Sequence, residues 1–148
     1  DVAGSKPPPG LGGADRGDGV RFLGRVSDAR EFLGSGAAMV VPLLSGAGVR
    51  VKILEAMALG IPVASTRLGA AGIGARDGEE ILLADSPTDL AGACAGLLSS
   101  PERAIAVGRA GRRRVRADFD ADGIARGLLE FLAALAPPAR PGPTGPNS

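Results

Sequence analysis

The sequence contains no histidine, tryptophan or tyrosine, and it has one cysteine. Histidine is the commonest ligand of protein-bound zinc and the usual general base, so its absence argues against a zinc centre and against a Ser-His-Asp hydrolase. Cys94 has no second cysteine with which to form a disulfide, and it lies among small residues. We therefore predict a reduced thiol in the core and no metal site.

The net charge is small, and the sequence also lacks long apolar runs. The 17 Lys and Arg against 16 Asp and Glu leave a formal net charge of +1, so no overall field attracts nucleic acid. The sequence has no charged-then-apolar leader and no run of about 18 apolar residues that could span a bilayer. These features predict a cytoplasmic protein without a nucleic-acid partner.

The organisation is that of one domain with a tail. A chain of 148 residues with 45% hydrophobic content can bury one modest core. Residues 136–148 are rich in Pro and Gly and carry no large apolar side chain, so we expect a disordered tail after a domain at 1–135. Residues 1–4 resemble the end of a strand that enters a Gly/Pro loop at 5–18, as if the chain were cut inside an element. We therefore expect a partial domain.

Strand and helix patterns alternate along the domain. The continuous apolar runs 37–41 and 61–65 are typical of strands covered on both faces of a parallel sheet. Between them, apolar residues recur at helical spacing from Val51 until Gly60, which is placed to end a helix. This βαβ unit predicts an α/β fold, a Rossmann-like doubly wound parallel sheet. We expect further strands at 20–24 and 79–83, and further helices from Asp28, from 87 to about 100, from Pro101, and over 121–135.

The helix predicted from Pro101 carries a basic stripe beside an apolar one. The basic residues are Arg109, Arg112, Arg113 and Arg116. Such a stripe could contact a membrane surface or nucleic acid, yet it occupies one helix, and the aromatic residues of the whole chain are four phenylalanines. A solvated helix face is the favoured interpretation.

The loop between the first buried strand and its helix, residues 42–50, has the features of an anion site. Gly46 and Gly48 allow the backbone to approach a ligand closely. The free N–H groups and positive dipole at the helix start suit a phosphate or diphosphate. Glycine-rich loops also serve geometry alone in many α/β proteins, so that alternative stays open.

Glu55 follows on the same helix, where its carboxylate could accept two hydrogen bonds from a vicinal diol such as ribose. Lys52 lies three residues earlier on the same face. The alternative is a surface ion pair between the two side chains, worth only about a few tenths of a kcal/mol.

The segment from Gly46 to Thr66, Gly-Ala-Gly-Val-Arg-Val-Lys-Ile-Leu-Glu-Ala-Met-Ala-Leu-Gly-Ile-Pro-Val-Ala-Ser-Thr, closely resembles the donor-site segment of family-4 (group 1) glycosyltransferases. The flanking segments 22–26, 40–43 and 77–85 resemble those of the same family in the same order, so the similarity covers roughly residues 1–135.

The resemblance implies a GT-B architecture, in which two Rossmann-like domains face across a cleft and the C-terminal one holds a nucleotide-diphosphate sugar. This chain resembles the later part of that C-terminal domain. By position, Glu55 would hold the ribose, the amides of Gly48, Val49 and Arg50 would face the diphosphate, and Gly24, Arg25 and Val26 would lie near the base. Such enzymes need no catalytic metal or cofactor, because amides and basic side chains offset the charge of the leaving diphosphate.

The chain departs from the family pattern at one position of this segment. Many relatives have a second glutamate eight residues before the ribose-binding one, and this sequence has Ala47 there. A subgroup with the pattern Gly-x-Gly-x-Arg-x-Lys is more similar, and it is matched by Gly46, Gly48, Arg50 and Lys52. In that subgroup, the residues at the positions of Arg50 and Lys52 are candidates for phosphate binding.

The resemblance also implies partners beyond this chain. The acceptor-binding Rossmann-like domain would precede residue 1, and the complete protein could associate peripherally with a membrane. Two alternatives remain open: an inactive fragment or non-catalytic nucleotide-binding module, and a sugar-nucleotide epimerase of the same fold. Catalytic residues and the acceptor are not assigned.

Overall fold

The computed structural model describes residues 1–4, 19–46 and 48–135. The predicted loop at 5–18, the tail at 136–148 and Ala47 lie outside this part. The strands are β1 (Val2–Ala3), β2 (Phe22–Gly24), β3 (Met39–Val41), β4 (Val63–Ser65) and β5 (Leu82–Leu83), and the helices are α1 (Ala29–Gly34), α2 (Val51–Leu59), α3 (Pro87–Ser99), α4 (Pro101–Asp118) and α5 (Ala121–Leu135).

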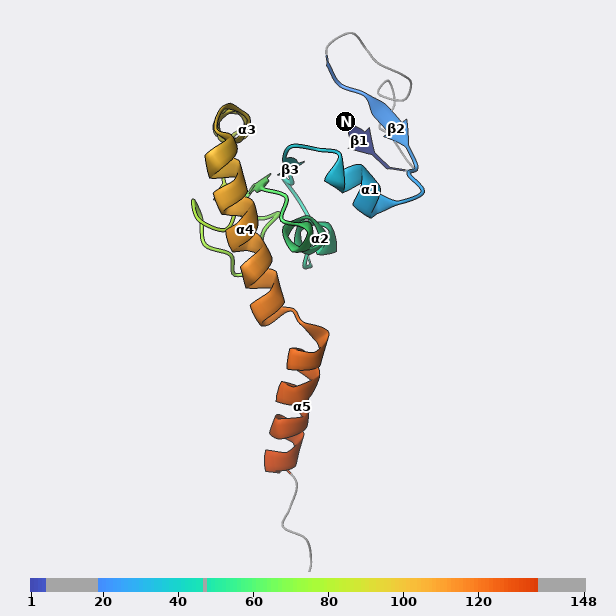
Figure 1. Cartoon of the computed structure of the whole chain (residues 1–148), viewed down its shortest axis with the longest axis vertical. Coiled ribbons are helices and arrows are strands. Elements are labelled where there is room, and N and C mark those ends of the chain that lie inside the picture. Colours follow the sequence, from blue (N-terminus) through green and yellow to red (C-terminus); the bar gives the residue numbers. More distant parts are fainter. Residues whose placement is uncertain (5–18, 47, 136–148) are drawn as a thin grey trace, which may run out of the picture.

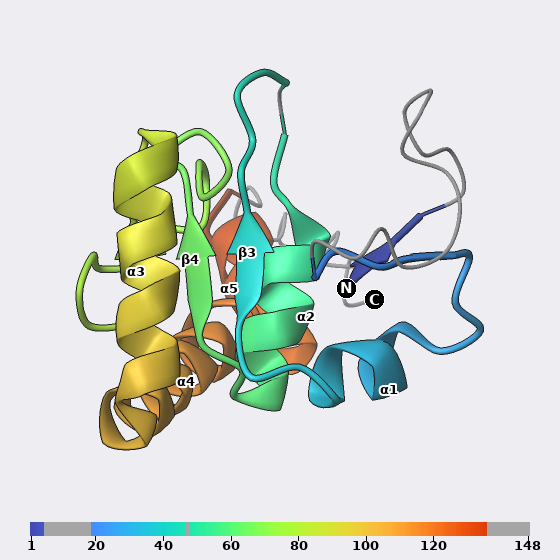
Figure 2. The ribbon, with the colours of Figure 1, turned by 90° about the horizontal axis from the view of Figure 1, so that it is seen from above.

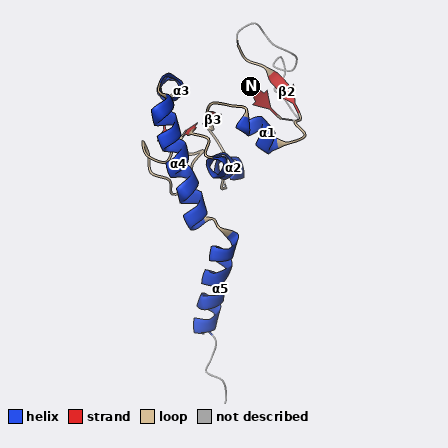
Figure 3. Ribbon diagram, viewed as in Figure 1, coloured by secondary structure: helices blue, strands red, loops and turns tan. Residues whose placement is uncertain are grey.

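Parallel strands form two sheets. β3, β4 and β5 pair in that order, with Met39 opposite Val63 in the register, and β1 pairs with β2. α2 connects β3 to β4, which confirms the predicted βαβ unit (Figures 1 and 2). Figure 3 shows helices dominating the rest of the described chain. The predicted α/β class is therefore confirmed.

Two clusters of buried side chains lie on opposite faces of the larger sheet, because neighbouring residues of a strand point to opposite sides. Val63 packs with α2 residues such as Ile53 and Met57, all at most 1% exposed. Ala64 packs instead with Leu90 and Leu97 of α3. Helices thus cover both faces, as a doubly wound sheet requires.

Local sequence signals fix the helix ends. The Asp28 carboxylate accepts hydrogen bonds from the amides of Arg30 and Glu31 at the start of α1. Gly60 ends α2 in the left-handed region at φ 79°, a conformation that glycine adopts without strain. The serines Ser86 and Ser100 cap α3 and α4, each of which begins with proline.

The prediction that the strand at 37–41 is covered on both faces is wrong for β3. Val41 is buried, but Val40 on the opposite face is 45% exposed. The reason is that α3 packs against β4 and β5 and leaves the side chain of Val40 uncovered. An apolar cavity of about 320 Å³ lies there instead, between Val40 and the first half of α3.

The predicted strand at 79–83 is shorter than expected. Only Leu82 and Leu83 are in strand conformation, and residues 79–80 belong to a turn. Glu80 is 6% exposed, and its carboxylate accepts hydrogen bonds from the backbone N–H and the guanidinium of Arg76. These bonds hold the chain in the turn and delay the start of the strand.

Small residues allow α4 to cross α2 closely. Gly108 of α4 packs so near the carbonyl of Gly60 that a Cβ atom at position 108 would overlap it. Gly111, one turn later, lies against the carbonyl of Glu80 at 2.9 Å from its ideal Cβ position. Both glycines are buried, and their spacing of three residues places them on the same side of α4.

α5 extends away from the sheet in Figure 1, and none of its residues is buried. The Asp120 carboxylate accepts a hydrogen bond from the amide of Gly123 at the start of this helix. Its large apolar side chains Ile124, Leu128, Leu129, Phe131, Leu132 and Leu135 are all more than half exposed. No described helix is long and apolar enough to cross a membrane.

Gly108→Ala should lower the free energy of unfolding by about 1–3 kcal/mol, because the new methyl group forces α4 away from the backbone of Gly60. Urea denaturation followed by circular dichroism measures this change. The matched control is Gly92→Ala on α3, where a Cβ would meet nothing within 4 Å, and it should raise stability by about 0.5–1 kcal/mol. Equal effects of the two substitutions would contradict the close crossing of α2 and α4.

Cys94 should react slowly with thiol reagents in the folded protein. Its side chain is partly buried against the α3 cluster, and burial raises the pKa of its thiol. A raised pKa means fewer thiolates at a given pH, and the thiolate is the reactive form. The rate of reaction with a maleimide at pH 8 should be lower than in 8 M urea, and it should still rise with pH where the rate for the unfolded chain has levelled off. Equal rates in both states would refute this.

Candidate functional site

The loop between β3 and α2 has the backbone conformation that its glycines predict. Gly46 has φ 123° and Gly48 has φ 88°, both in the region that other residues rarely adopt. The Arg50 guanidinium lies against Gly46, because a Cβ at position 46 would meet its Nη2 at 2.5 Å. Gly46 therefore leaves room for this arginine to fold back over the loop.

Arg50 has an unsatisfied hydrogen-bond donor. Its Nε atom is buried and has no hydrogen-bond partner among the described residues. A buried donor without an acceptor costs about 1–3 kcal/mol, so native proteins rarely leave one unpaired without a reason. An anion placed between this guanidinium and the loop would supply the acceptor.

The start of α2 differs from the other well-defined helix starts. Arg50 occupies the N-cap position in extended conformation and makes no side-chain cap, whereas Asp28, Ser86 and Ser100 cap their helices. The first N–H groups of α2 therefore lack a side-chain acceptor at the carboxyl end of β3, and the positive end of the helix dipole lies there. This arrangement suits a negatively charged group.

Four of the predicted site residues border one cavity of about 300 Å³. They are Arg25, Val26, Lys52 and Glu55, and Gly4 at the end of β1 lies beside them. Glu55 and Lys52 are both exposed, and the surface ion pair considered as an alternative does not form between them. The Glu55 carboxylate is thus available to hydroxyl groups of a ligand.

The remaining predicted residues lie outside that cavity. Gly24 ends β2 at φ 67° and directs the chain toward Arg25. Val49 is 47% exposed and leans toward Gly72, whose ideal Cβ position is 3.0 Å from its Cγ2. The predicted site residues therefore form two groups. One group lies in the loop before α2, and the other borders the cavity around Glu55.

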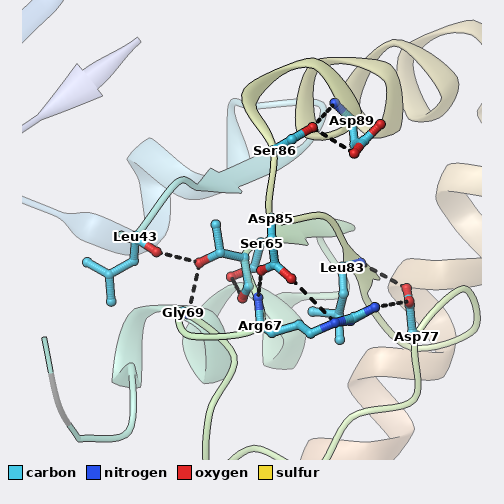
Figure 4. Close-up of polar contacts among 10 residues, drawn as sticks. Leu43, Ser65, Arg67, Gly69, Asp77, Leu83, Asp85, Ser86 and Asp89 are labelled. Atoms are coloured by element: carbon cyan, nitrogen blue, oxygen red, sulfur yellow. Dashed lines mark hydrogen bonds and ion pairs between the residues drawn. The ribbon is translucent and has the colours of Figure 1, made fainter. Parts of the chain in front are cut away.

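A network of polar contacts fastens the loops that follow β4 and β5 (Figure 4). The backbone N–H of Arg67 donates to Asp85 at 2.8 Å, and its Nε lies 3.4 Å from the same carboxylate. Asp77 accepts from the amide of Leu83 at 2.9 Å and approaches the Arg67 guanidinium at 4.0 Å. These contacts hold together the loops at the carboxyl edge of the sheet.

Thr66 connects the same edge to the loop after β3. Its hydroxyl donates to the carbonyl of Leu43 at 2.7 Å and accepts from the amide of Gly69 at 3.0 Å. Gly69 is needed here, because a Cβ would collide with the hydroxyl of Ser65. This network was not predicted from the sequence, although a hydroxyl or acidic residue directly after a buried strand is a signal that could have suggested it.

Comparisons with known proteins identify the family of this chain. The family model of group 1 glycosyl transferases matches residues 1–100. The trehalose synthase of Rubrobacter xylanophilus is 36% identical over 88 residues, which are 60% of this chain and 21% of that protein.

Solved structures show the same fold. HepE of Anabaena, in complex with UDP, is similar with a TM-score of 0.70 at 19% identity, over 77% of this chain and 32% of its own. Sucrose-phosphate synthase from Thermosynechococcus elongatus has a TM-score of 0.67 at 30% identity, over 80% of this chain and 31% of its own. The C-terminal domain of the group 1 protein LpcC from Francisella tularensis has a TM-score of 0.61 at 22% identity, over 68% of this chain and 53% of its own.

The chain therefore spans about a fifth of the trehalose synthase and about a third of two of these solved chains. The expectation of a partial Rossmann-like domain is confirmed, and the predicted family resemblance extends over most of the described residues. The chain belongs to the group 1 glycosyltransferase family, and it forms part of a domain of the GT-B fold.

Proposed function

We propose that this chain binds the nucleoside-diphosphate sugar from which a group 1 glycosyltransferase takes the sugar that it transfers. The observation that carries the proposal is the buried, unpartnered Nε of Arg50 beside the uncapped start of α2. Phosphate oxygens at this place would accept hydrogen bonds from the guanidinium and from the first N–H groups of the helix.

The same groups account for the chemistry of the leaving group. Cleavage of the sugar–phosphate bond leaves additional negative charge on the diphosphate. The amides of Gly48 and Val49, the dipole of α2 and the side chains of Arg50 and Lys52 would offset this charge. Catalysis in this proposal uses no metal ion, because fixed dipoles and cations already supply the electrostatic stabilisation.

The nucleoside would lie in the cavity next to this loop. Glu55 would accept hydrogen bonds from the two ribose hydroxyls, and Arg25 and Val26 would flank the base. A volume of about 300 Å³ is at the lower end of the range of small-molecule sites. HepE was solved with UDP, so UDP is the first nucleotide to test.

The complete reaction would also need the part of the protein that this chain does not include. Sugar transfer requires an acceptor site, and in the two-domain architecture implied by the resemblance that site lies on the facing domain. The trehalose synthase and the sucrose-phosphate synthase, by their names, both make disaccharide products, which is consistent with a sugar acceptor. Cytoplasmic location and peripheral membrane association of the complete protein stay predictions.

The experiment compares the thermal stability of the chain with and without UDP in the presence of EDTA. UDP should raise the melting temperature in a concentration-dependent way, because a ligand that binds only the folded state stabilises it. Glu55→Gln should weaken the apparent affinity about tenfold or more, since hydrogen bonds to a charged acceptor contribute about 1.5 kcal/mol or more each. Arg50→Gln should weaken UDP binding but leave the weaker effect of uridine unchanged.

Glu130→Gln on exposed α5 is the matched control, because it removes the same charge from a helix far from the cavity. An equal loss of UDP affinity in both glutamate variants would count against the ribose role of Glu55. A melting temperature that stays constant up to millimolar UDP would reject the proposed function for this chain.

A further inference from the structure

A third cavity, of about 460 Å³, is lined by residues of three helices. Figure 1 shows α2 between α4 and α1. Residues of these three helices line the cavity. They are Arg30, Glu55, Ala58, Leu59, Arg112 and Arg116. It is larger than the cavity assigned to the nucleoside, and its rim is dominated by positive charge.

The three arginines of this cavity are free to bind a ligand. In the described ranges 1–4, 19–46 and 48–135, none of the guanidinium groups of Arg30, Arg112 and Arg116 forms an ion pair or a hydrogen bond with another side chain. Four described arginines pair with a carboxylate, as Arg21 does with Asp1 and Arg114 with Asp118, but most do not. The three arginines of this cavity are therefore distinguished by their position around one cavity and not by the lack of an ion pair.

Rigid elements hold these side chains together. Arg112 and Arg116 are four residues apart and so lie on the same side of α4. α4 is fixed against α2 by the contact of Gly108 with Gly60, and the Cδ of Arg112 would lie 3.8 Å from a Cβ at position 60. Arg109 and Arg113 belong to the same basic stripe, but neither lines the cavity.

Guanidinium groups bind phosphate with two parallel hydrogen bonds, and several of them around one cavity are typical of phosphate recognition. The single acidic side chain of the cavity, Glu55, would repel a bare anion but would accept hydrogen bonds from hydroxyl groups. A ligand that satisfies both kinds of group carries a phosphate and adjacent hydroxyls.

We propose that this cavity is a second binding site, which takes a phosphorylated sugar. The phosphate binds Arg30, Arg112 and Arg116, and sugar hydroxyls bind Glu55. The volume fits such a compound, since small-molecule sites span about 300–1,000 Å³. This site differs from the diphosphate position proposed above, because Arg50 does not line the cavity, but it shares Glu55 with the cavity assigned to the nucleoside.

The test titrates the full chain with glucose 6-phosphate, inorganic phosphate and glucose, and follows binding by calorimetry. Glucose 6-phosphate should bind more tightly than inorganic phosphate, and glucose should not bind measurably. The double variant Arg112→Gln/Arg116→Gln should lose at least tenfold in affinity for glucose 6-phosphate. Circular dichroism melting checks that this variant and the control variant described next are folded.

The matched control is Arg109→Gln/Arg113→Gln, which removes the same charge from the same helix outside the cavity. It should bind glucose 6-phosphate as the parent does. Equal losses in both double variants would show nonspecific attraction by a basic helix and would overturn the proposal, as would the absence of binding to the parent chain.

Stabilisation by UDP distinguishes this site from the nucleotide site of the proposed function. The Arg112→Gln/Arg116→Gln chain should keep the stabilisation by UDP, whereas Arg50→Gln should reduce it and still bind glucose 6-phosphate. Loss of both ligands in the Arg112→Gln/Arg116→Gln chain would mean that there is one site and would overturn the second.

Discussion

The close crossing of α2 and α4 at Gly60 and Gly108 is the constraint on which the rest of the structure depends. α2 packs against both the sheet and α4, and at this point its contact with α4 is made backbone to backbone. That position places the start of α2 at the carboxyl end of β3, and it places Glu55 beside Lys52 on the free side of the helix. The same contact brings Arg112 to the end of α2. One pair of glycines thus organises both of the cavities that Glu55 borders.

Much of the fold follows from local chemistry and could be predicted from the sequence. Asp28, Gly60, Pro87 and Pro101 mark helix ends because they satisfy or terminate backbone hydrogen bonds within a few residues. The exposure of Val40 could not be predicted in this way. It depends on which strands α3 covers, and that is decided by packing between segments that are far apart in the sequence. The turn at Glu80 was missed for a similar reason, because apolar periodicity does not report that a carboxylate will be buried against Arg76.

The candidate site shows the same division. Gly46 and Gly48 were predicted from their positions in a strand-to-helix loop, and their positive φ angles confirm the conformational part of that prediction. The roles of Arg25 and Lys52 came from the family resemblance, and that of Glu55 came from its carboxylate chemistry as well. The structure adds that the three residues border a common cavity. Arg30 was not singled out from the sequence. It lines the same cavity as Arg116 because α1 and α4 both pack against α2. Contacts between distant elements are not visible in residue spacing.

The uncapped start of α2 implies a trade-off between stability and ligand affinity. Asp, Ser or Thr at position 50 would cap the helix from within, and such caps stabilise proteins by about 1 kcal/mol. The new side-chain oxygen would then occupy the amides that an external anion needs, so the gain in rigidity would come at the expense of recognition. Sequences selected only for thermal resistance would drift toward such a cap, and retention of arginine at this position would be a mark of continued selection for ligand binding.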